Sequence, residues 1–555
     1  MQRLLTLLTG TAVAAAPVTL VHLTDVHVDP YYVTGAATPG CFCETHETCA
    51  RFPASCVVTP DAAGAGPFGD SDADCATPPA LWGSAMGELS APATAGAQFA
   101  FFTGDFGSAG LSASCGGDGP RATTQILDVV SRGMAAARAA LPSARVFGVF
   151  GNHDTAPGDS FGNSAEMAWL YGPLADGAFG ADLNGDAAAL ATLRAGGWYT
   201  TDLTATTALV ALNTNYFGSF NPDSEATAMG ELEFAWLNST LAALAAANRS
   251  ALVIGHIPPK DGFWRGGLFS RYRAILTAYP VVLAAFFGHD HLDEFQIVRS
   301  CVPPSPAPQP PSNGPYDGPW LVTRGISWCS GGNYDVGDVW GRGTEPGSPH
   351  CPYLPPTNGT EEGSVALCEG LCGNATACRG FTRYPDDGST FGACCFRTSC
   401  VDKPPNANSS AVCYEKVAPE GPCDGGPQDP LHVLYVAPSL TEGYPPSNPG
   451  LRYYTLDSDR LAPLDTTTLW MNLSAANAAW APRWQVEYSA RAAYGLEDAS
   501  AGSWARALAR MAVDGAPEWA AFVNASRKQF AGTAVCEGTC KAAWIGYMNG
   551  SAADA

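Results

Sequence analysis

Six short apolar runs in the first 300 residues each end in a cluster of polar side chains. Continuous Val, Ala, Phe and Leu runs of this length are typical of β-strands that are buried on both faces. Helical patterns at 122–141 and 228–247 separate several of the runs, which predicts a layered α/β fold. In such folds ligands bind beyond the carboxyl ends of the strands, where these polar clusters lie. The runs are VTLVHLTDVH (18–27), QFAFFTGD (98–105), RVFGVFGNHD (145–154), TALVALNTN (207–215), ALVIGHIPP (251–259) and VVLAAFFGHDH (281–291).

The amino-acid composition of the chain changes after about residue 301. The segment CVPPSPAPQPPSNGP is rich in proline, which is typical of a linker or an extended loop. More than half of the 19 cysteines lie between 301 and 423, and this density indicates a small disulfide-rich unit. Strand patterns return at 431–440 and 450–457, and a helical pattern follows at 482–530. The cysteine-rich unit is therefore predicted to be an insertion into a domain that resumes after it. The stretch CEGTC is expected to close a small loop near the end.

Composition and the N-terminal segment favour secretion. The formal net charge of −23 excludes duplex nucleic acid as a partner, because phosphate binding needs an excess of basic side chains. The first 16 residues combine one arginine with a short apolar run ending in small residues, as in a secretory signal peptide. A buried first strand or a membrane anchor is the alternative, although the run is too short to span a bilayer comfortably. The cysteines and eight N-x-S/T sequons also favour a secreted or extracellular protein, or one of a lysosome-like acidic compartment. No transmembrane segment is expected.

The polar clusters at the strand ends contain the residue types that bind borderline divalent metals. Five of the nine histidines lie there, and two of them are spaced i, i+2 in the stretch GHDH. Imidazole nitrogens and carboxylate oxygens suit such ions, and a carboxylate shared by two ions makes a dinuclear centre that can hold a phosphoryl group. A single histidine after a strand is more often structural, and His22, inside an apolar run, is interpreted as a core or supporting residue. The candidates are Asp25, His27, Asp105, Asn152, His153, His256, His289 and His291.

The ordered motifs resemble those of the calcineurin-like metallophosphoesterases. They run D-x-H, GD, GNH, GH and GH-x-H along the chain. The stretches GNHD, LNTNYF, GHIPP, GHDHLDEF, NPGLRYYTLD and WQVEYSARAAYGL resemble, more narrowly, acid sphingomyelinase and the acid-sphingomyelinase-like phosphodiesterases over about 17–300 and 430–545. The resemblance implies an α/β fold, a four-layer αββα metallophosphoesterase sandwich with a small helical C-terminal subdomain. In this chain a disulfide-rich insertion would interrupt it.

The resemblance also implies two Zn²⁺ ions per chain, with manganese and iron as less favoured metals. His153 would protonate the leaving group or stabilise the transition state, and Asp105 would serve both ions. The remaining assignments follow the family's motifs position by position. One ion would be held by Asp25, His27, Asp105 and His291, and the other by Asp105, Asn152, His256 and His289.

Three features depart from the relatives. The catalytic motifs begin at about residue 18, so the saposin domain of acid sphingomyelinase is not expected before them. Relatives tend to carry a histidine a few residues after GD, whereas residues 106–120 contain none, which leaves His153 as the expected proton donor. The cysteine pattern of the insertion is similar to PAN/apple modules, which commonly bind proteins or carbohydrates. A disulfide-stapled loop without a partner is the alternative.

Purple acid phosphatases place a tyrosine three residues after the GD aspartate, where this chain has Ser108, and this favours two zinc ions.

The expected protein is a monomeric, secreted phosphodiesterase that cleaves sphingomyelin to ceramide and phosphocholine, with water bridging the metals as the attacking group. Its substrate would be a phospholipid or a nucleotide, and contact with a membrane surface is compatible with the sequence. Two alternatives stay open: hydrolysis of nucleotide phosphodiesters or pyrophosphates, and an extracellular binding protein acting through the PAN-like module. The expected organisation is a signal peptide (1–16), a catalytic domain (17–300), a Pro-rich linker and connecting segment (301–328), the Cys-rich insertion (329–425), the end of the catalytic domain (426–480) and a helical C-terminal subdomain (481–555).

Overall fold

The computed structural model describes most of the catalytic region and the C-terminal region of the chain. The described residues are 16–30, 32, 34–35, 64–70, 76–108, 120–260, 262–300, 429–442, 445–531 and 536–550, with the backbone of four further strands between 320 and 416. The predicted signal peptide and the PAN-like character of the insertion lie outside these residues. The chain divides into two units, one of Met1–Trp264, Ile275–Ser300 and Asp429–Ala555, the other of Arg265–Ala274 and Cys301–Gln428.

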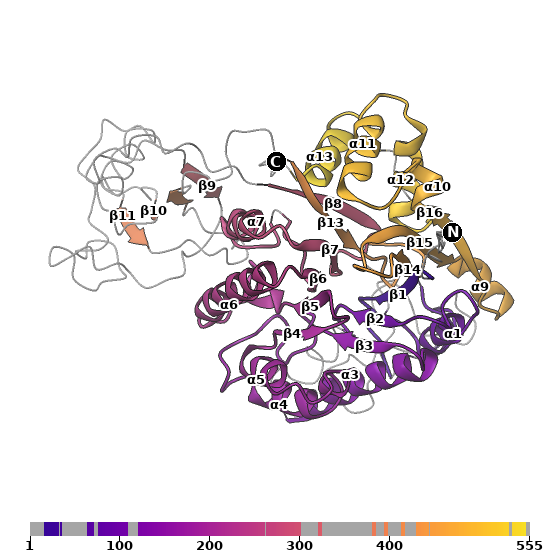
Figure 1. Ribbon diagram of the computed structural model, residues 1–555, viewed down its shortest axis with the longest axis horizontal. Helices are drawn as coiled ribbons and strands as arrows, with labels where there is room; N and C mark the ends of the chain where they lie inside the picture. Colours follow the sequence, from indigo (N-terminus) through magenta and orange to yellow (C-terminus); the bar gives the residue numbers. More distant parts are fainter. Residues whose placement is uncertain are drawn as a thin grey trace, which may run out of the picture. The chain divides into compact units, whose positions relative to one another are not determined.

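The first sheet of the larger unit joins the beginning of the chain to its C-terminal region (Figure 1). Its three N-terminal strands are parallel, and Leu20 lies opposite Phe99 in their register. The remaining strands are antiparallel to their neighbours and come from residues after 449. The order is β16 (Trp484–Ser489), β15 (Pro463–Met471), β14 (Gly450–Leu456), β1 (Val18–Leu23), β2 (Phe99–Phe102) and β3 (Arg145–Gly148).

The second sheet has a parallel centre with one antiparallel strand at each edge. Strand β13 follows the insertion in the sequence, and it lies between two strands that come before the insertion. The two halves of the catalytic domain are therefore built into one sheet. The order is β4 (Tyr199–Asp202), β5 (Thr207–Ala211), β6 (Ser250–Ile254), β7 (Val282–Phe287), β13 (Pro430–Val436) and β8 (Glu294–Arg299).

Aromatic side chains from both sheets form the core between them. Phe101 of β2 and Phe286 of β7 pack edge to face with ring centroids 5.3 Å apart. Tyr454 of β14 packs in the same way on Tyr435 of β13, at 5.2 Å. All four rings are almost fully buried. Each such ring stabilises the fold by ~1.5–3 kcal/mol through burial, so this layer holds the two sheets face to face.

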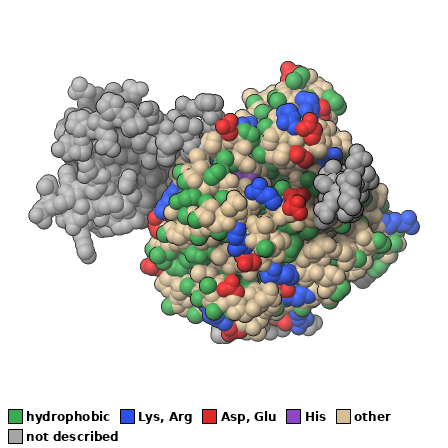
Figure 2. Space-filling model, in the orientation of Figure 1, with side chains coloured by type: hydrophobic (Ala, Val, Ile, Leu, Met, Phe, Trp, Pro, Cys, Tyr) green, Lys and Arg blue, Asp and Glu red, His purple; other side chains and the backbone are tan. Residues whose placement is uncertain are grey.

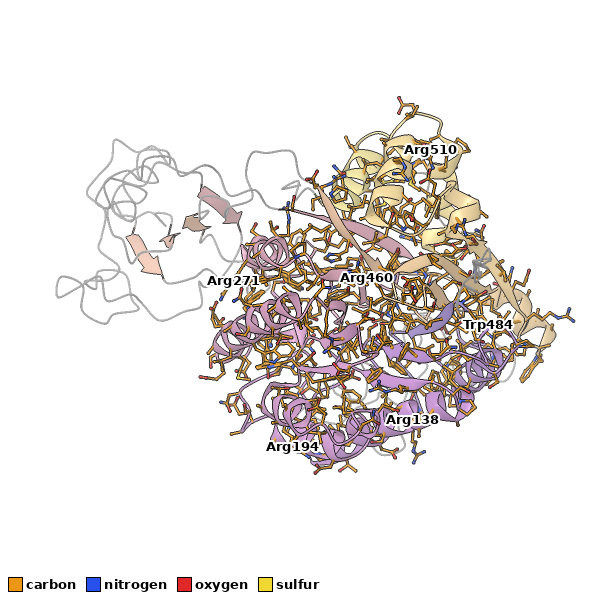
Figure 3. The ribbon with its side chains drawn as sticks, viewed as in Figure 1. Arg138, Arg194, Arg271, Arg460, Trp484 and Arg510 are labelled. Carbon is orange, nitrogen blue, oxygen red and sulfur yellow. A yellow bond between two sulfur atoms is a disulfide. The ribbon has the colours of Figure 1, made fainter. Side chains whose placement is uncertain are left out.

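Helices cover the outer faces of both sheets and complete a four-layer αββα sandwich, as the motifs predicted (Figure 1). Helix α3 packs on β3 of the first sheet, and α6 packs on β6 of the second. Figure 3 shows Arg138 and Arg194 in the outer helical layer, where Arg138 binds Asp182 and ties α3 to a short 3₁₀ turn. The bounds are α1 (Pro79–Leu89), α3 (Pro120–Ala140), α4 (Ala168–Asp176), η1 (Gly180–Asp182), α5 (Ala187–Gly196), η2 (Thr214–Tyr216), α6 (Ala226–Ala246) and α7 (Leu268–Ala278).

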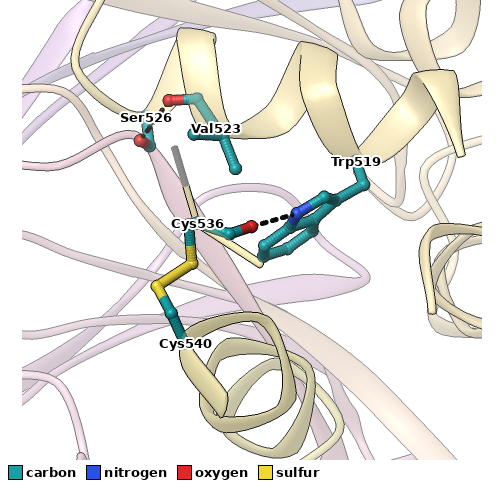
Figure 4. The surroundings of a disulfide bond; sticks show 5 residues. All are labelled: Trp519, Val523, Ser526, Cys536 and Cys540. Carbon is teal, nitrogen blue, oxygen red and sulfur yellow. Dashed lines mark hydrogen bonds between the residues drawn. A yellow bond between two sulfur atoms is a disulfide. The ribbon is translucent and has the colours of Figure 1, made fainter. Parts of the chain in front are cut away.

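Two of the C-terminal helices pack on β8 of the second sheet, one of them also on β13, and another packs on β15 and β16 of the first sheet. The predicted small loop is confirmed: Cys536 and Cys540 form a disulfide at the start of the last helix, and the Trp519 indole donates to the Cys536 carbonyl at 2.7 Å (Figure 4). Residues 484–489, expected to be helical, instead form the edge strand β16, because their alternating Trp, Val and Tyr side chains pair with β15. The helices are α9 (Leu473–Ala479), α10 (Ala490–Tyr494), α11 (Ala501–Met511), α12 (Pro517–Ser526) and α13 (Thr539–Met548).

The smaller unit contains an antiparallel four-stranded sheet in the order β11-β10-β12-β9. The strands are β9 (Trp320–Arg324), β10 (Gly380–Tyr384), β11 (Ala393–Arg397) and β12 (Val412–Lys416). On the face of the molecule in Figure 2, side chains of both charge signs are interspersed over the described residues. Within the part of the chain that the structure describes, none of the helices has the length and apolar character that crossing a bilayer requires.

His432 on β13 makes stability depend on acidity. The side chain is buried opposite Val298, and burial lowers its pKa to about 3. The unfolded chain binds this proton near pH 6.5, so stability falls as the pH falls from 6.5 towards 3. At pH 5 the loss relative to pH 8 should be ~2 kcal/mol. His432→Leu should therefore lose less urea resistance than the wild-type protein between pH 8 and pH 5. Equal losses in the two proteins would contradict this.

Candidate metal centre

The predicted site residues follow strands at the carboxyl edges of both sheets. Asp25 and His27 follow β1, Asp105 follows β2, and His289 and His291 follow β7. All five have left-handed backbone conformations, with φ between 40° and 73°. Such conformations are unfavourable for residues with a Cβ and persist where the surroundings impose them, often at functional sites.

Main-chain hydrogen bonds between the loops hold this backbone in place. The Asp25 amide donates to the Gly104 carbonyl at 3.1 Å, and the His27 amide donates to the Asp105 carbonyl at 3.0 Å. The loops after β1 and β2 are therefore linked directly. The sharp turns aim the side chains into one space beyond the strands.

A first group of donors comes from three strand ends. The ligand atoms of its four residues all lie within 4.8 Å of one another. The Nε2 atoms of His27 and His291 are 3.1 Å apart, and His27 Nε2 lies 3.4 Å from Asp105 Oδ2. His291 Nε2 lies 3.5 Å from a carboxylate oxygen of Asp25. The group consists of Asp25, His27, Asp105 and His291.

A second group shares Asp105 with the first. His256 Nε2 lies 3.3 Å from Asp105 Oδ2, the same oxygen that faces His27. The Asn152 side-chain oxygen lies 2.9 Å from both His256 Nε2 and His289 Nδ1. The aromatic rings of Phe220 and Phe263 flank His289, with centroids 5.2 and 4.9 Å from its own. The structure therefore brings all seven predicted ligand residues together, in two groups that meet at one carboxylate.

The hydrogen bonds made by the Nδ1 atoms of two of these histidines are consistent with metal binding through Nε2. His27 Nδ1 lies 3.1 Å from the Gly107 carbonyl, and His256 Nδ1 lies 2.7 Å from the Thr103 carbonyl. A carbonyl can only accept, so each Nδ1 carries the proton and each Nε2 presents its lone pair to the centre of the group. Facing lone pairs and carboxylate oxygens repel one another unless a cation lies between them. The donor set suits two borderline divalent ions.

The electrostatics agree with this reading. Burial lowers the pKa of His27 to about 4 and that of His289 to about 3, which keeps both rings neutral, the form that binds metals. Burial of Asp105 opposes its charge, but the neighbouring His256, His153 and His27 hold its pKa well below the ordinary value. For His256 burial is likewise outweighed, because the charge of Asp105 raises its pKa to about 9. Nε2 of His256 would therefore carry a proton in the absence of a metal ion, and binding of a metal would displace that proton. The carboxylate of Asp105 is the anionic centre that attracts positive charge here.

His153, the predicted proton donor, lies beside the first group. Its amide donates to Asp105 Oδ1 at 2.8 Å, and its ring centroid is 5.4 Å from that of His27. The side chain is half-buried, whereas Asp25, His27 and Asp105 are buried. His22, interpreted as a supporting residue, is buried with its Nε2 2.9 Å from the Thr103 hydroxyl. It therefore supports the strand end whose carbonyl binds His256.

Asp154 is a residue of the site that the sequence reasoning missed. Its carboxylate accepts from the amides of Asp105 and Gly151, at 2.9 and 2.7 Å, and from the amide of Phe106 at 2.9 Å. Burial and the nearby Asp105 charge raise its pKa to about 7. The residue clamps the loop after β2 to the loop after β3. Its place as the last letter of the GNHD motif was the available signal.

Two face-to-face sheets, outer helices and a shared-carboxylate donor cluster at one edge are the fold and the site that the resemblance to the calcineurin-like metallophosphoesterases implies. Residues 429–549 match the family model described as acid sphingomyelin phosphodiesterase C-terminal region. The chain is 23% identical over 544 residues to acid sphingomyelinase-like phosphodiesterase 3b of Homo sapiens, a match that covers 94% of this chain and 85% of that protein. These matches confirm the resemblance to acid sphingomyelinase and its relatives.

Two further relatives match over shorter stretches. Sphingomyelin phosphodiesterase of Homo sapiens is 34% identical over 166 residues, which cover 27% of this chain and 24% of that protein. A cyclic GMP-AMP phosphodiesterase of Rattus norvegicus is 27% identical over 298 residues, which cover 50% of this chain and 59% of that protein. Among solved structures, a dimetal phosphatase from Danio rerio aligns with a TM-score of 0.29 and 14% identity, covering 51% of this chain and 83% of that chain.

Asp154→Asn tests the clamp between the two loops. The new amide group cannot accept from all three main-chain donors, and one unsatisfied buried group costs ~1–3 kcal/mol. We expect a lower melting temperature and weaker retention of metal during dialysis, measured by elemental analysis. Asp159→Asn is the matched control, because the Asp159 side chain accepts a hydrogen bond from the Asn152 side chain through one oxygen, which asparagine retains. Equal metal retention in the two variants would contradict the role of Asp154.

Proposed function

We propose that this protein is a secreted, dinuclear metal-dependent phosphodiesterase of the acid sphingomyelinase type. The observation that carries the proposal is the position of Asp105 Oδ2, which faces His27 at 3.4 Å in one donor group and His256 at 3.3 Å in the other. A carboxylate shared in this way is what a two-metal centre for phosphoryl transfer needs. Zinc is the proposed metal, because histidine nitrogens predominate among the ligands and carboxylates are few.

Each ion has its own set of ligands in this proposal. The set around His27 and the set around His256 both use Asp105, which reduces the charge repulsion between the two ions. Asn152 contributes a neutral oxygen to the second set. The first ion is held by Asp25, His27, Asp105 and His291, and the second by Asp105, Asn152, His256 and His289.

The chain's own groups then act around the bound substrate. Two bound metal ions would supply an activated water and would neutralise charge on the phosphoryl oxygens. His153 lies on the same loop as Asn152, and its amide is fixed on Asp105, so its half-buried imidazole stands beside the first donor group. From this position it protonates the oxygen that leaves phosphorus. The rings of Phe220 and Phe263 pack against His289 and give the second donor group an apolar surface.

Sphingomyelin is the proposed substrate, with ceramide and phosphocholine as products. The support is the match of residues 429–549 to the acid sphingomyelin phosphodiesterase C-terminal region, because this region supplies β13, β14, β15 and β16 to the same sheets that carry the site. The alternative is a nucleotide phosphodiester or pyrophosphate, which is supported by the similarity to a cyclic GMP-AMP phosphodiesterase. Secretion into an extracellular or lysosome-like acidic compartment is part of the proposal.

A substrate panel with purified protein tests the activity. Sphingomyelin vesicles and a nucleotide diester should be assayed before and after treatment with a chelator, with metal content measured in the same samples. We expect about two zinc ions per chain and loss of diester hydrolysis when they are removed, restored by added zinc. Asp105→Asn should lose both ions and nearly all activity. Asp128→Asn, an exposed aspartate of α3 paired with Arg132, is the matched control and should behave as wild type. Full hydrolysis by metal-free protein would contradict the proposal.

His153→Ala tests the proton donor. An alkyl leaving group needs a proton, and general-acid help of this kind is worth ~10²–10⁴-fold. The variant should keep its metals and lose most activity on a diester with an alkyl leaving group. It should lose far less on a p-nitrophenyl ester, whose leaving group needs no proton. Equal losses on both substrates at unchanged metal content would show that His153 acts on the phosphoryl charge instead.

A further inference from the structure

The C-terminal region forms hydrogen bonds with the main chain of the turn that carries His289 and His291. We propose that Lys528 is a positioning residue, which fixes the main chain of His291 and thereby strengthens the hold of the first donor group on its metal ion. This inference rests on the proposed function, because it assumes that His291 binds a metal. It assigns to the C-terminal region a direct part in building the site.

The contact itself is a buried, charge-assisted hydrogen bond. Lys528 Nζ donates to the His291 carbonyl at 3.0 Å and lies 3.2 Å from the Ser439 hydroxyl. The Ser439 hydroxyl reaches the same His291 carbonyl at 3.2 Å and the Thr441 carbonyl at 2.6 Å. Lys528 has no exposed surface. Hydrogen bonds from an ammonium group are about twice as strong as those between neutral groups.

His291 needs this support more than His27 and His256 do. His27 and His256 each place their second ring nitrogen on a main-chain carbonyl, which sets the orientation of the ring. Within the described residues, the Nδ1 atom of His291 is buried and has no hydrogen-bond partner. The orientation of this ring therefore depends on its main chain, which has a left-handed φ of 58°. The carbonyl that Lys528 binds belongs to that main chain.

Lys528 is itself held in an unusual conformation. It follows the end of α12, and both Lys528 and Gln529 have left-handed backbones, with φ of 52° and 57°. The Asn448 side chain donates to the Lys528 carbonyl at 2.9 Å, and the Lys528 amide donates to the Ala525 carbonyl at 2.8 Å. The lysine is thus fixed at both its amide and its carbonyl.

The same turn is held at a second point nearby. The Asp293 amide donates to the carbonyl of Ser526, two residues before Lys528, at 2.9 Å. The Asp293 carboxylate is bound by Arg452, and by the hydroxyls of Thr468 and Tyr488 at 2.9 Å. These partners lie on β14, β15 and β16 of the first sheet. The ligand turn of the second sheet is therefore fixed by strands of the first sheet and by the end of α12.

The test compares two buried lysines of the C-terminal region. Lys528→Met removes the ammonium group beside the site and keeps a side chain of similar length. Lys541→Met is the matched control, because Lys541 is also buried, also donates to a main-chain carbonyl, that of Val513 at 2.8 Å, and lies over the Trp519 ring. Ser439→Ala removes the hydroxyl that contacts both the Lys528 ammonium group and the His291 carbonyl, and it is a milder change. Metals per chain are measured during titration with a chelator, alongside the melting temperature.

We expect both lysine variants to melt at lower temperature, but only Lys528→Met to release one of its two metals at ~10–100-fold lower chelator concentration, as is usual when a group that orients a ligand is removed. Ser439→Ala should shift the release of the same metal in the same direction but by a smaller factor. If Lys528→Met does not fold, the result for Ser439→Ala tests the inference. If the Lys528 and Ser439 variants release metal as Lys541→Met does, the inference is wrong. A wild-type protein that binds no metal would instead contradict the proposed function.

Discussion

One buried carboxylate, that of Asp105, determines the arrangement of the site. Its Oδ2 atom faces His27 and His256, and its Oδ1 atom accepts the amide of His153. Its own amide is bound by Asp154. An anion taken out of water is costly unless charges and hydrogen bonds compensate it. Two cations between this carboxylate and the surrounding imidazoles would provide that compensation, so the proposed metals would stabilise the fold as well as take part in the chemistry.

Strands from the first 300 residues and from the C-terminal region together build the two sheets that carry this centre. Strands after residue 429 enter both sheets, and the ammonium of Lys528 and the guanidinium of Arg452 reach the turn that carries His291. The C-terminal region therefore contributes strands to the sheets that carry the site and does not form a separate unit beside them.

The sequence predicted the elements whose signal is local. Apolar runs ending in Asp, Asn and His identified the strand ends, and the rule that carboxyl ends of parallel strands meet at one edge grouped the eight candidate residues there. The division of seven of them into two sets of metal ligands came from the resemblance to the family. Asp154 and Lys528 were missed, because their contacts join residues 49 and 237 positions apart and leave no periodic pattern. The edge strand β16 was expected to be helical, because its pairing with β15 is decided by tertiary contacts. The PAN-like character of the insertion stays a prediction, since it lies outside the described residues.

Anomalous diffraction from crystals of the protein, collected at the zinc absorption edge, tests the central claim most directly. The account predicts two peaks ~3.5–4 Å apart, both at ~2.0–2.2 Å from the carboxylate of Asp105. One should also touch the nitrogens of His27 and His291, and the other those of His256 and His289. A single peak, or two peaks that do not share Asp105, would contradict a dinuclear centre built on this carboxylate.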